Sequence, residues 1–371
     1  MSLLSTESEI FRDFIRRIPD YLCTGLTRKK MLKHSLLILS LSFLSACSNM
    51  AYYSQAINGQ WDIFKRSQSI DHLLAASNTP TGLKQQLAEI LKIRAFASET
   101  LHLPDNRSYT DYADLERPFV VWSVFATRPF SFAPKKWCFF IVGCVSYRGY
   151  FSEAGATTLA EKLRAQGYDV YLAGIPAYSS LGWFNDPVLN TMLGWPQHRI
   201  AGLIFHELAH QKLYIQNDTA FNEAFAMTVE YIGIERWLAR KGINRVKYEQ
   251  ARQRQIDFIE LVLSTRKHLQ QVYQQNLSRT KMQAAKIAAF DKLRAQYQQL
   301  KTRWNGYAGY DAWFAKDLNN AKLLSVVTYQ DLVPAFRALF NKVGGDLPAF
   351  YQAVAELGKL PLKERHAKLR H

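Results

Sequence analysis

Two histidines four residues apart, with a glutamate directly after the first, lie in the segment IFHELAHQ, residues 204–211. If residues 199–213 form a helix, His206 and His210 share one face, at the separation that two imidazoles need to bind one zinc ion. Glu207 then lies about 100° around the helix from His206, so its carboxylate can reach a water on the metal without binding the metal. The segment therefore predicts a zinc site with a general base beside it.

A glutamate in the next segment can supply the third ligand. A turn and a second, largely apolar helix follow His210, and Glu223 falls in the first turn of that helix. Glu230 lies on the same face, seven residues further on, and is the rival. We expect Glu223 to be the ligand because Asn222 precedes it and the turn is short, whereas Glu230 can instead hold one histidine by a hydrogen bond.

Three blocks of sequence resemble a known family. They are HELAHQ (206–211), NDTAFNE (217–223) and SSLGWFNDPV (179–188). Together with a lipobox-like LSAC (44–47), they are similar to the bacterial putative aminopeptidases, predicted zincin-type zinc lipoproteins of Gram-negative bacteria. The resemblance runs from about residue 57 to the C-terminal helices. It implies a zinc metallopeptidase of the aminopeptidase type that acts on peptide substrates and binds one Zn²⁺ per chain.

The expected reaction is hydrolysis, in which zinc lowers the pKa of its water and Glu207 takes the proton and passes it to the leaving amine. A second group usually stabilises the oxyanion, and we prefer Tyr178, which lies in a loop between a predicted strand and the first metal helix. The other candidates for that role are Tyr147, Arg148 and His198. An aminopeptidase also needs a carboxylate for the substrate's ammonium group, and the sequence offers Asp186 and Glu230 without choosing between them.

Two other functions stay open. A zinc endopeptidase of the cell envelope would have the same metal site without a carboxylate for the free amine. A non-catalytic envelope lipoprotein would have a structural zinc site or none. Structural zinc sites are usually closed by four protein ligands, commonly cysteines, whereas this segment offers three ligands and no cysteine. The ligand set therefore favours hydrolysis.

An apolar run near the N-terminus predicts export. Leu36–Leu44 is too short to span a bilayer comfortably and follows the basic residues 28–30, as in a secretory signal. The run ends in a lipobox whose cysteine, Cys47, we expect to be lipidated and to anchor the protein in a membrane. Ser48 follows that cysteine instead of the aspartate associated with the inner membrane. We therefore predict an outer-membrane lipoprotein that faces the periplasm of a Gram-negative bacterium.

The segment before this signal fits poorly with export. Met31 stands where a signal would start, so we interpret residues 1–30 as a non-native extension and residues 31–47 as the signal peptide. The formal net charge of +16 would allow a nucleic-acid partner, but no nucleic-acid-binding motif is present and the basic residues are spread along the chain. A solvated basic surface near a membrane is the interpretation we prefer. Nothing in the sequence indicates an oligomeric state.

Around these residues, the pattern predicts an α+β domain, mostly α, over residues 48–371. Helical spacing of apolar residues predicts helices over 59–77 and 83–101. A small mixed β-sheet, about 117–175, is expected to precede the zincin-like helices at about 199–240. It would use strands in 119–132, 136–151 and Asp169–Ala173.

The remainder of the chain, 243–371, is expected to be helical. Its first part lacks Gly and Pro between Gly242 and Gly306 and predicts a long helix or an antiparallel pair broken near residues 276–278. Cys138 and Cys144 could pair in an oxidising compartment, but only if the chain turns between them, for example at Gly143.

Overall fold

The computed structural model describes residues 52–370, apart from 140–142, 178, 181, 183, 316 and 327–329. The chain divides into two units, of which the second spans Asn58–His371 and contains every feature discussed below. The predicted signal peptide, its lipidation site Cys47 and the candidate Tyr178 lie outside the described residues. None of the helices found among the described residues has the length and apolarity needed to cross a bilayer.

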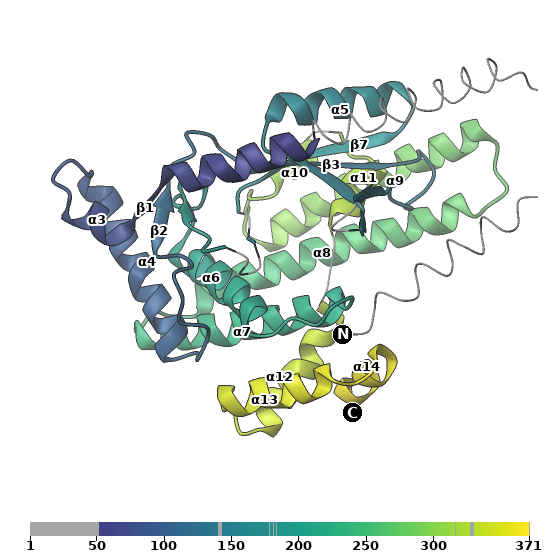
Figure 1. Cartoon of the computed structure of the whole chain (residues 1–371). Helices are drawn as coiled ribbons and strands as arrows, with labels where there is room; N and C mark the ends of the chain where they lie inside the picture. The colour runs from purple at the N-terminus through teal and green to yellow at the C-terminus, as the bar shows by residue number, and fades with distance from the viewer. Residues whose placement is uncertain are drawn as a thin grey trace, which may run out of the picture. The chain divides into compact units, whose positions relative to one another are not determined.

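The fold class is α+β and mostly α, as predicted (Figure 1). Residues 52–66 are helical. The helices after them are α3 (Ile70–Ala75), α4 (Thr81–Glu99), α5 (Glu153–Ala165), α6 (Gln197–Lys212), α7 (Thr219–Arg240), α8 (Val246–Tyr273), α9 (Arg279–Arg303), α10 (Asp311–Ala315), α11 (Asn320–Ser325), α12 (Val333–Lys342), α13 (Leu347–Gly358) and α14 (Leu362–Arg370). The strands are β1 (Ser67–Ser69), β2 (Asp111–Ala113), β3 (Val121–Thr127), β4 (Trp137–Phe139), β5 (Gly143–Val145), β6 (Tyr147–Tyr150), β7 (Asp169–Ile175) and β8 (Val188–Leu189).

The strands of the described residues form three small sheets, in the orders β1-β2-β8, β6-β3-β7 and β4-β5. In the sheet that contains β3, both pairings are antiparallel, whereas the sequence predicted a mixed sheet in this region. A parallel pairing does occur, but between β2 and β8, which lie on either side of that region in the sequence. Two helices, α5 and α11, both pack against β3 and β7, so the central sheet is contacted by a second helix from the C-terminal region.

Two expected elements are divided in the structure. The helix predicted over 59–77 is interrupted, because residues 67–69 pair with β2 as strand β1 before α3 begins. The strand predicted over 136–151 becomes the β4–β5 hairpin followed by β6. In the hairpin, Cys138 lies opposite Cys144 and the two form a disulfide. Gly143 is the first residue of β5 and not a turn residue, and residues 140–142 lie outside the described residues.

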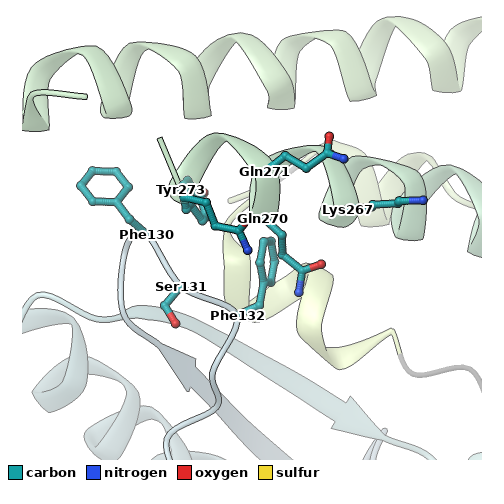
Figure 2. A pocket seen from close by; sticks show the side chains of 8 residues that line it. Phe130, Ser131, Phe132, Lys267, Gln270, Gln271 and Tyr273 are labelled. Carbon is teal, nitrogen blue, oxygen red and sulfur yellow. The ribbon is translucent and has the colours of Figure 1, made fainter. Parts of the chain in front are cut away.

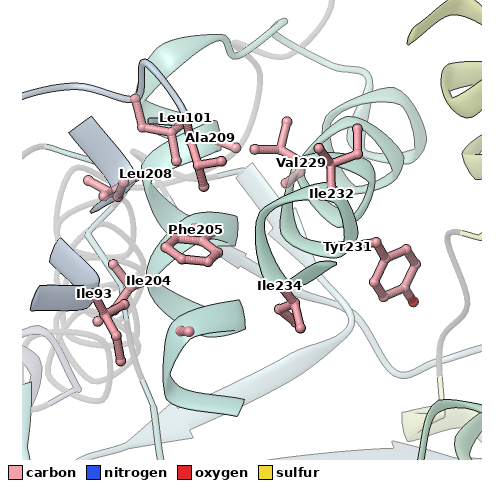
Figure 3. Close-up of a cluster of buried hydrophobic side chains, with 14 of the residues drawn as sticks. Ile93, Leu101, Ile204, Phe205, Leu208, Ala209, Val229, Tyr231, Ile232 and Ile234 are labelled. Atoms are coloured by element: carbon pink, nitrogen blue, oxygen red, sulfur yellow. The ribbon is translucent and has the colours of Figure 1, made fainter. Parts of the chain in front are cut away.

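Helices α6 and α7 form the centre of the largest hydrophobic core (Figure 3). Each helix carries a glycine where it meets its neighbour. A Cβ atom on Gly202 of α6 would lie 2.8 Å from the Ile234 side chain, and a Cβ on Gly233 of α7 would lie 2.5 Å from the ring of Phe205. These glycines let the two backbones approach closely. The side chains of α7 can therefore reach the histidines of α6.

The stretch between Gly242 and Gly306 forms an antiparallel pair of helices, α8 and α9. This is one of the two predicted alternatives, and the single long helix is not formed. The chain reverses over residues 274–278, at the predicted break. The pair has its own hydrophobic core and is tied to the sheet by Lys286, whose buried ammonium group binds Asp169 at 2.5 Å and the carbonyl of Pro129 at 2.8 Å. Between α8 and the 130–132 loop after β3 lies a hollow of about 490 Å³ (Figure 2).

Candidate metal centre

Three of the predicted residues converge between α6 and α7. His206 and His210 lie one turn apart on α6, and their Nε2 atoms are 3.2 Å apart. Glu223, the fifth residue of α7 and so one position past the predicted first turn, has one carboxylate oxygen 3.4 Å from Nε2 of His206 and the other 3.6 Å from Nε2 of His210. The three side chains form a cluster of potential metal ligands among the described residues.

The spacing of these ligand atoms fits a zinc ion. Two ligand atoms at about 2.0–2.2 Å from one ion, at a tetrahedral angle, are about 3.3–3.6 Å apart. The Nε2–Nε2 separation of 3.2 Å is just below that range, and the distances of 3.4 and 3.6 Å to the two oxygens of Glu223 fall within it. With one ligand atom per residue, the three atoms lie within 4.8 Å of one another. Two imidazoles and one carboxylate are also a donor set that zinc accepts in catalytic sites. The cluster could therefore hold a zinc ion with only small movements of its side chains.

Local hydrogen bonds in the turn between α6 and α7 fix where Glu223 lies. The amide of the buried Asn222 accepts a hydrogen bond from the backbone N–H of Ile215 at 2.8 Å and donates one to the carbonyl of Ile215 at 2.7 Å. Asp218 caps α7, because its side chain accepts a hydrogen bond from the N–H of Phe221. Hydrogen bonds thus fix both ends of the turn, and Glu223, the fifth residue of α7, contacts the histidines of α6.

Glu230 lies on the other side of the His206 ring. One of its carboxylate oxygens is 3.1 Å from Nδ1 of His206, while Nε2 of the same ring faces the cluster. A carboxylate in this position orients the imidazole and keeps the opposite nitrogen available to a metal. Nδ1 of the buried His210, by contrast, has no hydrogen-bond partner among the described residues.

The charges in the cluster attract a cation. Burial alone would lower the pKa of His206, but the hydrogen bonds with Glu223 and Glu230 outweigh it and raise that pKa to about 10. Burial and the neighbouring His206 lower the pKa of His210 to about 4. Burial opposes ionisation of Glu223, yet its hydrogen bond with His206 lowers the pKa of the carboxyl overall. One positive charge is therefore favoured between these groups, and a metal cation would meet the same field.

The fourth motif residue, Glu207, lies apart from the three ligand atoms and in a polar network of its own. Burial raises the pKa of its carboxyl group, and the nearby charges of Glu223 and Asp186 act in the same direction. The hydroxyl of Ser179 hydrogen-bonds the Glu207 carboxylate and lies 3.2 Å from Oδ2 of Asp186. The buried Tyr109 also hydrogen-bonds Ser179. Glu207 is therefore held by a loop that lies far from it in the sequence.

The remaining sequence candidates make other contacts. Asp186, a candidate for the substrate's ammonium group, is only 2% exposed and accepts a hydrogen bond from the N–H of Ser180 at 2.8 Å. Its carboxylate is therefore hydrogen-bonded to Ser180 of its own loop. The oxyanion candidates are dispersed: Tyr147 packs on Phe125 at 5.4 Å, Arg148 lies over the ring of Tyr150 at 5.7 Å, and the ring of His198 is 5.7 Å from that of Tyr248.

Two supports of the site were missed by sequence reasoning. Gln211, next to His210, binds the side chains of Asn106 at 2.7 Å and Ser108 at 3.3 Å. The buried cap residue Asp218 binds Arg365 at 2.5 Å and His366 at 2.9 Å, both on α14. Arg365 and His366, neighbours in a short C-terminal helix, gave only a weak signal in the sequence that they support the site. Only the fold brings them to the start of α7.

A family model described as "Putative aminopeptidase" matches residues 51–369, which is most of the chain. No curated protein matches the chain, and no solved structure does.

Proposed function

Because this chain belongs to the putative aminopeptidase family, we propose that it hydrolyses peptides with one zinc ion held by His206, His210 and Glu223. The observation that carries the proposal is the convergence of these three ligands from two helices, with separations that suit a single tetrahedral ion. When bound, a zinc ion would act as a Lewis acid on the scissile carbonyl and make water easier to deprotonate. Structural sites usually close with four protein ligands, so three ligands favour a reactive site.

The protein's own groups would move the proton. Glu207 takes a proton from the attacking water and delivers it to the leaving amine. Its raised pKa makes it a better base than an exposed carboxylate, and it is not one of the clustered metal ligands. Glu230 holds the imidazole of His206 in the orientation that presents Nε2 to the cluster.

Ser179 has a positioning role in this proposal, because its hydroxyl limits the rotation of the Glu207 carboxylate. We expect Ser179→Ala to lower kcat about tenfold while KM and zinc content stay near the wild-type values. Ser179→Thr keeps the hydroxyl and should retain most of the activity. Steady-state kinetics with metal analysis measures both variants. An equal loss of kcat in the alanine and threonine variants would mean that the shape of the loop, and not the hydroxyl group of Ser179, positions Glu207.

The family name favours substrates with a free N-terminus, but an endopeptidase and a non-catalytic envelope lipoprotein remain the alternatives. Zinc content and hydrolysis of a matched pair of peptides, one free and one N-acetylated, separate the three. We expect about one zinc per chain and cleavage of the free peptide only. Equal cleavage of both peptides would favour the endopeptidase. A chain that binds zinc and cleaves neither peptide would contradict the enzyme proposal.

We also propose that a lipid on Cys47 anchors the protein at the outer membrane, facing the periplasm. The disulfide between Cys138 and Cys144 supports an oxidising compartment. Cys47→Ser should then shift the protein from the membrane fraction to a released form after cell fractionation. Unchanged membrane association of this variant would contradict the anchor.

A further inference from the structure

The three C-terminal helices enclose an apolar groove of about 640 Å³. Its floor consists of alanines and leucines from α12, α13, α14 and the loop before α14: Ala335, Ala338, Leu339, Ala353, Leu357, Leu360 and Leu369. The volume lies in the range of about 300–1,000 Å³ that is usual for small-ligand sites. Three alanines stand where larger side chains would fill the space. The small side chains of these alanines therefore leave the groove open.

Positive side chains surround this groove. Lys342, Lys368 and Arg370 are exposed at its edge, and none of them forms a salt bridge with a residue that the structure describes. The fourth cation, Lys359, is paired at 2.6 Å with Glu356, the one carboxylate of the lining. Four cations and one anion give the lining a net charge of +3. Like charges gathered around apolar surface are complementary to a ligand with an apolar body and a negative end.

We propose that this groove binds a single-chain anionic amphiphile, an acyl chain that ends in a carboxylate or phosphate. The chain would lie on the alanine and leucine floor, and the anionic group would lie among Lys342, Lys368 and Arg370. A concave groove between three helices admits one chain, whereas attraction to a bilayer face would call for a flat or convex basic surface. The proposal does not depend on zinc or on peptide hydrolysis.

The position of α14 supplies a second measurement. This helix lines the groove with Lys368, Leu369 and Arg370, while Arg365, one turn earlier, binds Asp218. A ligand that bridges α12 and α14 should slow local opening of α14. Hydrogen–deuterium exchange of the amides in residues 362–370 is therefore expected to slow on binding, and exchange in α8 should stay the same.

Calorimetric titration of the full chain with dodecyl phosphate, at low ionic strength and below its micelle concentration, tests the proposal. We expect one site per chain. Dodecyl maltoside, which has the same chain and a neutral head, should bind at least tenfold more weakly, and inorganic phosphate should give no measurable binding. Decyl phosphate should bind about fifteenfold more weakly, because each buried methylene contributes about fourfold. Added salt should weaken the binding of the anionic ligands more than the binding of the neutral one.

Two sets of variants locate the site. Ala338→Trp fills the floor of the groove and should weaken the binding of dodecyl phosphate at least tenfold. Ala367→Trp, at an exposed residue of α14 outside the lining, should leave that binding unchanged. The double variant Lys342→Glu with Lys368→Glu should lose the preference for the anionic head but keep its affinity for dodecyl maltoside. Lys363→Glu, on the same helix and outside the lining, is its charge control.

Three results would overturn the proposal. One is unchanged affinity for dodecyl phosphate in both Ala338→Trp and the double charge variant. Another is binding to anionic vesicles without binding to monomeric dodecyl phosphate, which would make the surface a bilayer contact. The third is displacement of dodecyl phosphate by an acidic amphipathic helical peptide that binds more tightly, which would make the groove a protein-docking site.

Discussion

Glu207→Gln is expected to lower kcat for peptide hydrolysis about 10³-fold and to leave the zinc content near one per chain. Glutamine keeps the size of the side chain, but its amide cannot accept the proton of the attacking water. General acid–base catalysis by one side chain typically contributes about 10²–10⁴-fold, so this loss should be the largest among variants that retain the metal. Glu207 lies outside the ligand cluster, and the metal should therefore stay.

The matched control is Glu249→Gln, an exposed carboxylate of α8 that pairs with Arg245 at 3.0 Å. This variant should keep wild-type kinetics, since surface pairs of this kind contribute little. Active-site titration and metal analysis on the same preparations distinguish lost chemistry from lost protein. A Glu207→Gln enzyme with more than a tenth of the wild-type kcat would show that another group acts as the base.

The second large effect concerns the two glutamates of α7. Glu223→Ala should weaken zinc binding by more than a hundredfold and abolish hydrolysis with it, because it removes one of three ligands. Glu230→Ala removes only the hydrogen bond to Nδ1 of His206, and loss of such a partner typically weakens a metal site about 10–100-fold. Competition with a fluorescent zinc chelator measures both affinities on one scale.

The order of the two effects tests the assignment of the third ligand. Nε2 of His206 faces Glu223 and Nδ1 faces Glu230, so the two carboxylates cannot exchange roles without a rotation of the ring. If Glu230→Ala loses more zinc than Glu223→Ala, the third ligand is Glu230 and the arrangement between α6 and α7 must change when the metal binds. Circular dichroism of both variants checks that α7 is still folded.

Local patterns made the centre of the site predictable. The histidine spacing and the apolar residues around it predicted a helix over 199–213, and α6 spans Gln197–Lys212. A stretch without Gly or Pro, with a polar break near 276–278, predicted the α8–α9 pair. These features depend on neighbours within one or two turns of helix, which is the range over which sequence patterns carry information.

The supports of the site depend on contacts between distant segments, and the sequence could not reveal them. Ser179 binds Glu207 from a loop that precedes α6, and the pairing of 67–69 with β2 overrides a helical pattern. Strand pairing is set by tertiary contacts as much as by propensity. Gly202 and Gly233 are meaningful only once α6 and α7 are known to be neighbours.

The contact between Asp218 and α14 also has a consequence for the order of events during folding. Arg365 follows Asp218 by 147 residues. Until α14 packs, the carboxylate that caps α7 has no cation from that helix, so it must stay hydrated. The start of α7, which precedes Glu223, is therefore expected to reach its final packing late, after α14 has formed.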